Sequence, residues 1–357
     1  MPLTKLQFKP GINKEITNYS NELGWNKSDK VRFKKGFPEQ IGGWTRVSDT
    51  QVVGTPRTLI NWIALDGDNL IGIGTNVKYY VLEGQTYSDK TPIRLSATFD
   101  GGSGNPAINP FTTASSSTTV TVAHTGHGAD DGSYVTFKNA TAVNGVPAAE
   151  LNKEHRLTYV DANSYTITVT TAASGAGSGG GSTVVGEYQI NPGQEIFSYT
   201  SGWSSGTWST GSWGQTGFSD LAEQLRLWIH DSYGEDIITN VYQENIYYLD
   251  KDGTAASKTS SPYTSSSEIE YRMRSIFDIA TAASASNTAY IPTKVTYSMV
   301  SQQARHVICF GANNQNGTGA FDPLLVRWSS SEDYQDWRPL STNSAGDFRL
   351  EQGSQIV

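Results

Sequence analysis

The sequence predicts a mainly β protein in which β-propeller-like blades are combined with an inserted small β-barrel or sandwich. Its 357 residues include 36 glycines, 18 tyrosines and 9 tryptophans, and only 17% of them are charged. Such a composition is typical of short strands joined by tight turns. Two further observations support this prediction: a strand–turn–strand pattern recurs along the chain, and two Gly/Ser-rich stretches enclose a compact β segment.

The recurring pattern occupies residues 69–84, 223–253 and 305–340, where apolar strands alternate with polar or glycine turns. Units of about 40–50 residues with a few antiparallel strands are typical of propeller blades. One blade cannot bury both of its faces alone, so several blades must pack around one axis. Because propellers usually have about four to eight blades, three blades do not close a ring. We expect either a longer protein or other chains to complete it.

The predicted insert occupies residues 100–185. It begins with DGGSGNPAINPFTTASSS and ends with AASGAGSGGGS, and both stretches have the composition of linkers. Between them, apolar and polar residues alternate in SYVTF, and YVDANSYTITV indicates a hairpin. The expected organisation is therefore an N-terminal arm with the first blade (1–99), the inserted β domain (100–185) and further blades (186–357).

Charge and composition exclude several classes of function. The net charge is −8, whereas a nucleic-acid-binding protein usually carries a basic excess. No apolar run approaches the roughly 18 residues of a membrane-spanning helix, and the N-terminus lacks the apolar centre of a signal peptide. The single cysteine, Cys309, excludes an intramolecular disulfide, and its apolar HVICFG segment favours a small buried residue over a reactive thiol. We expect synthesis in the cytoplasm.

Three tryptophans, Trp203, Trp208 and Trp213, are spaced five residues apart in a glycine- and serine-rich segment. One interpretation is an aromatic platform for sugars or for a partner chain. The other, which we favour, is that the three rings anchor an irregular loop and fill gaps between blades.

Candidate catalytic and metal-binding residues are few. His124 and His127 lie near Asp130 and Asp131, but this turn lacks a third well-placed ligand, so we expect a polar turn and no metal. The sequence contains no GxSxG, HExxH, phosphate-binding or dinucleotide-binding motif. We therefore expect neither enzymatic activity nor a cofactor.

An acidic cluster of Glu332, Asp333 and Asp336 stands beside Trp337. Paired carboxylates serve glycoside hydrolysis, yet close carboxylates on one loop seldom lie on opposite sides of a sugar bond. A turn or a partner contact is the favoured interpretation, with Asp333 and Trp337 as candidate contact residues.

Several segments resemble a known family. Residues 6–47 combine an extended start, a Gly-Ile pair, a Trp before an Arg-Phe strand, a Gly-Phe-Pro turn and a Gly-Gly-Trp. Residues 71–93, 213–238 and 322–350 resemble blade strands of the same family, and residues 126–152 resemble β modules inserted in phage virion proteins. Together they resemble the tail accessory or nozzle proteins, also called DNA-stabilisation proteins, of short-tailed bacteriophages.

The resemblance implies a structural virion protein without catalytic residues, assembled as a six-fold ring below the portal and its adaptor. Such a protein retains packaged DNA and conducts it at ejection without sequence-specific binding. An acidic chain suits that role, because it avoids gripping phosphates. The basic stretch with Arg32, Lys34 and Lys35 is a candidate contact with an acidic neighbour, and a solvated strand face is the alternative.

Two other classes of function remain as alternatives. The first is a carbohydrate- or receptor-binding tail module that uses the three tryptophans. The second is a polysaccharide-degrading enzyme that uses carboxylates such as Asp333 and Asp336. Loss of glycan binding after a Trp→Ala substitution would identify the first, and loss of activity after a carboxylate-to-amide substitution would identify the second.

Overall fold

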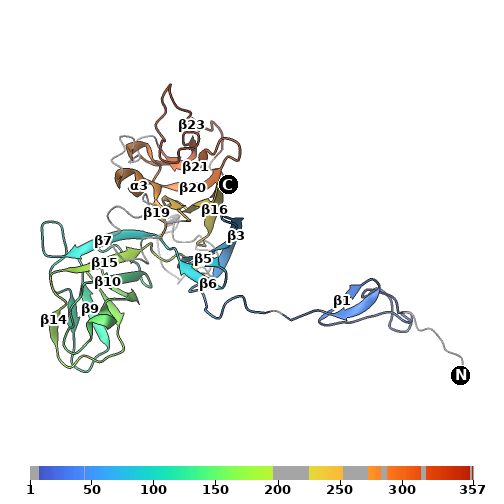
Figure 1. The fold of residues 1–357 in the computed structure, drawn as a ribbon, viewed down its shortest axis with the longest axis horizontal. Coiled ribbons are helices and arrows are strands. Elements are labelled where there is room, and N and C mark those ends of the chain that lie inside the picture. The colour runs from blue at the N-terminus through green and yellow to red at the C-terminus, as the bar shows by residue number, and fades with distance from the viewer. Residues whose placement is uncertain are drawn as a thin grey trace, which may run out of the picture. The chain divides into compact units, whose positions relative to one another are not determined.

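The computed structural model describes residues 8–43, 45–195, 225–251, 272–282, 288–314, 319–353 and 356. The chain divides into two units, Met1–Asp49 and Thr50–Val357. Antiparallel sheets account for most of the regular structure in both units, which confirms the mainly β fold class (Figure 1). Among the described residues, no helix has the length and apolar character needed to cross a membrane.

The first unit contains one hairpin, formed by β1 (Val31–Lys34) and β2 (Phe37–Gln40). Lys35 and Gly36 connect the strands, and both have positive φ angles, of 50° and 83°. A two-residue turn with two positive φ angles matches the right-handed twist of a hairpin. The ring of Trp25 packs between Phe8 and Phe33 and gives the hairpin a small aromatic contact.

Three four-stranded antiparallel sheets in the second unit have the strand order of propeller blades. The first blade contains β3 (Pro56–Ile63), β4 (Asn69–Thr75), β5 (Tyr79–Glu83) and β6 (Thr86–Asp89). The second contains β16 (Trp228–Tyr233), β17 (Asp236–Val241), β18 (Ile246–Leu249) and β19 (Arg274–Ser275). The third contains β20 (Val295–Val300), β21 (Val307–Asn313), β22 (Phe321–Trp328) and β23 (Gly346–Arg349). The described part of each predicted repeat (69–84, 223–253 and 305–340) contributes strands to one of these blades.

The three blades stack face to face, with their first strands adjacent. Strand β3 contacts β16, and β16 contacts β20, so the first strands of the three blades lie next to one another in order. In β17 the side chain of Ile237 packs toward the first blade, and that of Ile238 packs toward the third. Because both faces of the second blade are covered, five of the six residues of β17 are buried.

Trp228 is the central side chain between the first two blades. Its indole packs against Tyr79, and its Nε1 donates a hydrogen bond to the carbonyl oxygen of Thr75 at 2.8 Å. A Cβ atom on Gly74 would lie 2.6 Å from Cδ1 of this indole. Gly74 lies within β4, and the absence of a side chain at this position lets the indole of Trp228 approach the strand.

Asn240 is the main polar contact between the second and third blades. Its fully buried side chain donates a hydrogen bond to the carbonyl oxygen of Val295 and accepts hydrogen bonds from the backbone nitrogen and hydroxyl of Ser298. Nearby, a carboxylate oxygen of Asp231 accepts a hydrogen bond from the backbone nitrogen of Val300 at 2.8 Å. These bonds satisfy backbone groups of β20, which has a strand partner on one side only.

Between the first and second blades, the chain forms a β-sandwich with its own core. One sheet has the order β11-β10-β15-β7 and the other β12-β13-β9-β8-β14. Buried residues of both sheets meet in one cluster, which includes Phe99, Phe137 and Tyr165. Val135 and Phe137 of the SYVTF segment are buried, as their alternation predicts. Of the two expected architectures, barrel or sandwich, the structure has the sandwich.

The strands of the sandwich extend beyond the expected insert on both sides, because β7 pairs with β15. The first sheet contains β7 (Ile93–Phe99), β10 (Tyr134–Lys138), β11 (Glu154–Arg156) and β15 (Val184–Gln189). The second contains β8 (Phe111–Thr113), β9 (Thr119–Ala123), β12 (Thr158–Asp161), β13 (Ser164–Thr168) and β14 (Gly177–Gly179). Among the described residues, the helical elements are α1 (Ala148–Leu151), α3 (Ile276–Ala282) and the 3₁₀ turn η1 (Thr288–Tyr290).

Replacing Asn240 with alanine is expected to lower the free energy of unfolding by about 2–3 kcal/mol, because buried backbone groups of β20 lose their partners. Urea denaturation measures this change. Thr121→Ala, which shortens an exposed polar side chain of β9, is the control and should change the free energy by less than about 0.5 kcal/mol. Equal effects of the two substitutions would contradict the bridging role of Asn240.

Candidate functional site

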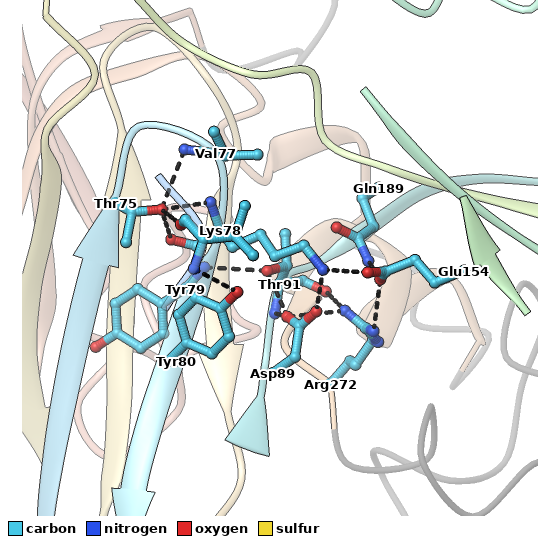
Figure 2. A network of polar contacts seen from close by, with 11 residues as sticks. Thr75, Val77, Lys78, Tyr79, Tyr80, Asp89, Thr91, Glu154, Gln189 and Arg272 are labelled. Carbon is cyan, nitrogen blue, oxygen red and sulfur yellow. Dashed lines mark hydrogen bonds and ion pairs between the residues drawn. The ribbon is translucent and has the colours of Figure 1, made fainter. Parts of the chain in front are cut away.

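Four charged side chains meet where the sandwich joins the first blade (Figure 2). Lys78 directly precedes β5, and Asp89 is the last residue of β6 in the same blade. Glu154 begins β11 of the sandwich, and Arg272 lies just before β19 of the second blade. We call these four residues the charged joint, because they bring together three parts of the second unit.

Each cation of the charged joint contacts both carboxylates. The Nζ atom of Lys78 lies 2.8 Å from a carboxylate oxygen of Asp89 and 2.5 Å from one of Glu154. The guanidinium of Arg272 lies 3.0 Å from the other oxygen of Asp89 and 3.6 Å from the other oxygen of Glu154. The two positive and two negative charges cancel, which a site with little solvent requires.

Neighbouring polar groups fix the orientation of both carboxylates. Asp89 accepts hydrogen bonds from the backbone nitrogen and the hydroxyl of Thr91, at 2.9 and 2.6 Å. Glu154 accepts a hydrogen bond from the side-chain nitrogen of Gln189 at 2.5 Å. Gln189 ends β15, the last strand of the sandwich, so both chain connections of the sandwich lie close to the charged joint.

The electrostatics of the joint favour its charged form. Burial by itself would lower the pKa of Lys78, whose side chain is only 4% exposed, but the carboxylates of Asp89 and Glu154 raise that pKa above its usual value. Burial would likewise raise the pKa of Asp89, but Arg272 and Lys78 lower it below its usual range. The charged side chains hold one another, so the joint is suited to positioning the sandwich.

A polar groove of about 460 Å³ lies on the sandwich beside the joint. Its lining includes Asp131, Lys153, Glu154, His155 and Arg156. His155 is buried, and its Nε2 lies 3.2 Å from the carbonyl oxygen of Leu151. Among the described residues, no group of three or more His, Cys, Asp or Glu side chains is arranged to hold a metal ion.

The His124–His127 turn uses its imidazoles for structural hydrogen bonds. Nδ1 of His127 accepts a hydrogen bond from the backbone nitrogen of Ala129, and Nε2 lies 2.9 Å from the carbonyl oxygen of Asp161. Nδ1 of His124 lies 2.6 Å from the hydroxyl of Tyr188. Burial, with a smaller contribution from nearby Arg94, lowers the pKa of His124 to about 4, so this ring is neutral at pH 7.

The basic residues predicted as a contact lie on the N-terminal hairpin. Arg32 and Lys34 belong to β1 and Lys35 to its turn, and all three side chains are exposed. Arg32 pairs with Glu39 across the hairpin at 3.2 Å. The other predicted contact residues, Trp203, Trp208 and Trp213, lie outside the residues that the structure describes.

The acidic cluster in the third blade is a turn around a buried tryptophan. Trp337 is 1% exposed, packs in the core between the second and third blades, and donates a hydrogen bond to the carbonyl oxygen of Tyr334. The prediction that Trp337 contacts a partner is therefore corrected, because the core between the second and third blades encloses its ring. Asp333 is exposed and accepts a hydrogen bond from the backbone nitrogen of Gln335, and Asp336 accepts one from Asn343.

Sequence reasoning did not find the charged joint. Its members, Lys78, Asp89, Glu154 and Arg272, are spread along most of the chain, so no motif or local spacing connects them. The available signal was local: Asp89 stands two residues before Thr91, a spacing at which a carboxylate commonly accepts hydrogen bonds from the backbone. That signal indicates a turn and does not reveal the cations.

No protein-family model matches the chain, and no curated protein matches it. Among solved structures, the phage phi92 endosialidase matches over 84% of this chain and 38% of its own, with 11% sequence identity and a TM-score of 0.23. The match therefore spans well under two thirds of that protein. A TM-score this low indicates neither a common fold nor a common activity.

Replacing Lys78 with methionine keeps the length of the side chain but leaves two carboxylates facing one guanidinium. We expect the free energy of unfolding to fall by about 3 kcal/mol, because breaking a buried ion pair leaves uncompensated charge. Arg349→Met is the control, since Arg349 pairs with Asp322 at 2.7 Å but is 58% exposed, and its removal should cost less than about 1 kcal/mol. Similar losses in both variants would show that the joint is no stronger than a surface pair.

The contribution of the charged joint is expected to depend on pH. Because folding lowers the pKa of Asp89, its ionised form stabilises the folded state fully above the ordinary value of about 3.9, and this contribution is lost as pH falls through the lower folded value. The loss caused by Lys78→Met should therefore be full at pH 7 and smaller near pH 2. Denaturant unfolding at both pH values measures it, and an unchanged difference would contradict this electrostatic origin.

Proposed function

We propose that this chain is a structural subunit of a bacteriophage tail, in the tube or nozzle below the portal and its adaptor. In this role it retains packaged DNA, conducts DNA at ejection, and contacts copies of itself and other tail proteins as part of a virion. The role is structural and involves neither catalysis nor a cofactor.

The agreement between the sequence resemblance and the architecture carries this proposal. The resemblance implies propeller blades with an inserted β module, and the described residues form stacked four-stranded blades with a sandwich between the first two. Fold alone does not define function, so the residues of the resemblance and the architecture support the proposal only together.

Two physical features suit the proposed role in a tail. The sandwich is fixed to the blades by the charged joint, whose side chains come from three separate parts of the chain. The chain is acidic overall, with a net charge of −8, which disfavours tight binding of DNA phosphates in a conduit.

The basic face of the N-terminal hairpin is the proposed contact with an acidic neighbour in the tail. Charge reversal of Arg32, Lys34 and Lys35 to glutamate is expected to weaken recruitment to portal–adaptor complexes at least about tenfold, since rim charges govern association and its salt dependence. Co-sedimentation with purified complexes at two salt concentrations measures this.

The matched control reverses Lys153 and Arg156, which are exposed charges on the sandwich. Recruitment should persist in this control. Equal recruitment of all variants would remove the hairpin from the contact, and no recruitment of the unmodified chain would contradict the proposed function. Glycan binding that depends on Trp203, Trp208 and Trp213 would instead support a receptor-binding module.

A further inference from the structure

The N-terminal unit, Met1–Asp49, has regular structure but no apolar core of its own. Besides the β1–β2 hairpin, its backbone forms a parallel bridge between Ile12 and Trp25. Among its described residues, 8–43 and 45–49, Asn21 is the one buried residue, and no apolar residue is buried. Apolar burial is the main contribution that offsets the entropy of ordering a chain. We therefore expect a partner surface to supply the burial that this unit lacks.

The exposed apolar side chains of this unit are large and numerous. Tyr19 is 91% exposed and Phe37 is 75% exposed. In the described part of the chain, eight of the 20 exposed large apolar residues lie in this short unit. They are Phe8, Ile12, Ile16, Tyr19, Leu23, Phe37, Ile41 and Val47. Such a concentration marks an interaction surface.

The same unit is basic, whereas the rest of the chain is acidic. Met1–Asp49 contains nine Lys or Arg residues and five Asp or Glu residues, while Thr50–Val357 contains 17 and 29. At the end of the hairpin, Lys34 and Lys35 are exposed, and Phe37 pairs with Lys34 across the turn. We call residues 34–37 the hairpin tip. It presents two ammonium groups beside an aromatic ring, so it fits an acidic surface with an exposed apolar side chain.

One end of the blade stack has this chemistry. The turns that follow β3, β16 and β20 lie there, and Leu65 in the first of them is 90% exposed. Two cations, Lys251 and Arg305, lie among a larger number of carboxylates. We call the carboxylates together with Leu65 the acidic edge. Its described carboxylates are Asp66, Asp68, Glu235, Asp236, Asp250, Glu332 and Asp333.

Contacts between the blades make the acidic edge continuous. A carboxylate oxygen of Glu235 in the second blade accepts a hydrogen bond from the backbone nitrogen of Leu65 in the first, at 3.3 Å. The ring of Tyr334 in the third blade stacks on that of Tyr248 in the second, with their centroids 4.2 Å apart. Carboxylates of both blades surround this pair of rings: Asp236, Asp250 and Asp333. The edge therefore spans all three blades.

We propose that the hairpin tip of one copy binds the acidic edge of another copy of this chain. Lys34 and Lys35 face the carboxylates, and Phe37 packs on Leu65. The inference deepens the hairpin contact proposed above and rests on it, because it names a copy of this chain as the acidic neighbour. Each copy has one tip and one edge, so copies join in series, and they form a ring where the rotation closes.

The length of the connecting chain favours another copy over the same copy. Ile41 is hydrogen-bonded to the hairpin, and Val53 accepts a hydrogen bond from Thr75, the last residue of β4. The chain between Ile41 and Val53 spans at most about 40 Å when fully extended. Because Thr75 lies at the end of β4 opposite the acidic edge, a path over the surface to Glu332 covers about 23 Å along β4 and about 20 Å across two sheet spacings. The same copy could bind only with this chain fully extended.

Mixing two variants tests the proposal. The tip variant carries Lys34→Glu and Lys35→Glu, and the edge variant carries Asp68→Lys and Glu332→Lys. In sedimentation velocity at low salt, we expect the unmodified 38.7 kDa chain to self-associate at micromolar concentration. Each variant alone should have a dissociation constant at least about tenfold higher, because like charges then face each other. An equimolar mixture should associate again, because the tip of one variant and the edge of the other are unmodified.

Matched controls separate the contact from general effects of substitution. Phe37→Ser should weaken self-association at least about tenfold, because it removes the aromatic side chain from the contact. Val160→Ser, at a 52% exposed position of β12 in the sandwich, should not. Lys153→Glu with Arg156→Glu, also on the sandwich, is the control for the tip variant and should associate as the unmodified chain does. Far-UV circular dichroism confirms that all variants are folded.

An unmodified chain that stays monomeric at all concentrations would overturn the proposal. Variants that associate alone as well as the unmodified chain, or a mixture that does not associate, would overturn it too. Recruitment to portal–adaptor complexes is measured separately. A monomer that is still recruited would contradict this inference and leave the proposed function standing, whereas self-association without recruitment would do the reverse.

Discussion

A four-stranded blade with apolar residues on both faces is stable only between two other sheets, and this constraint governs the second unit. The second blade meets it fully, since β17 is buried on both sides. The polar contacts follow the same stacking: Trp228 donates to a carbonyl oxygen of the first blade, and Asn240 binds the edge strand of the third. In the described part of the chain, each end blade packs against another blade on one face.

The sandwich is stabilised in a different way from the blades. It has a core of its own, so its attachment to the blades needs to fix position rather than supply its main burial. Two cations and two carboxylates in mutual contact fix position well, because each charge has two partners and their sum is zero. Stability in this protein therefore comes mainly from apolar faces, whereas the orientation of the sandwich depends on buried charge.

Local features could be predicted from the sequence, whereas features that depend on residues far apart in the sequence could not. Alternation in SYVTF predicted the buried Val135 and Phe137, and the apolar HVICFG segment predicted a small buried residue at Cys309. The charged joint has no local pattern, because Lys78 and Arg272 are far apart in the sequence and contact the same two carboxylates only in the folded structure. Trp337 was a candidate contact residue because it stands beside an acidic cluster, but its ring lies in the core between the second and third blades.

The central claim is that apolar faces hold the blades in one stack, whereas the charged joint fixes the orientation of the sandwich on that stack. A crystal structure of the Lys78→Met variant, compared with that of the unmodified chain, tests this claim most directly. The account predicts that the blades and the core of the sandwich keep their structures, while the sandwich changes its orientation on the blades. An unchanged orientation of the sandwich, or blades that no longer stack, would contradict the account.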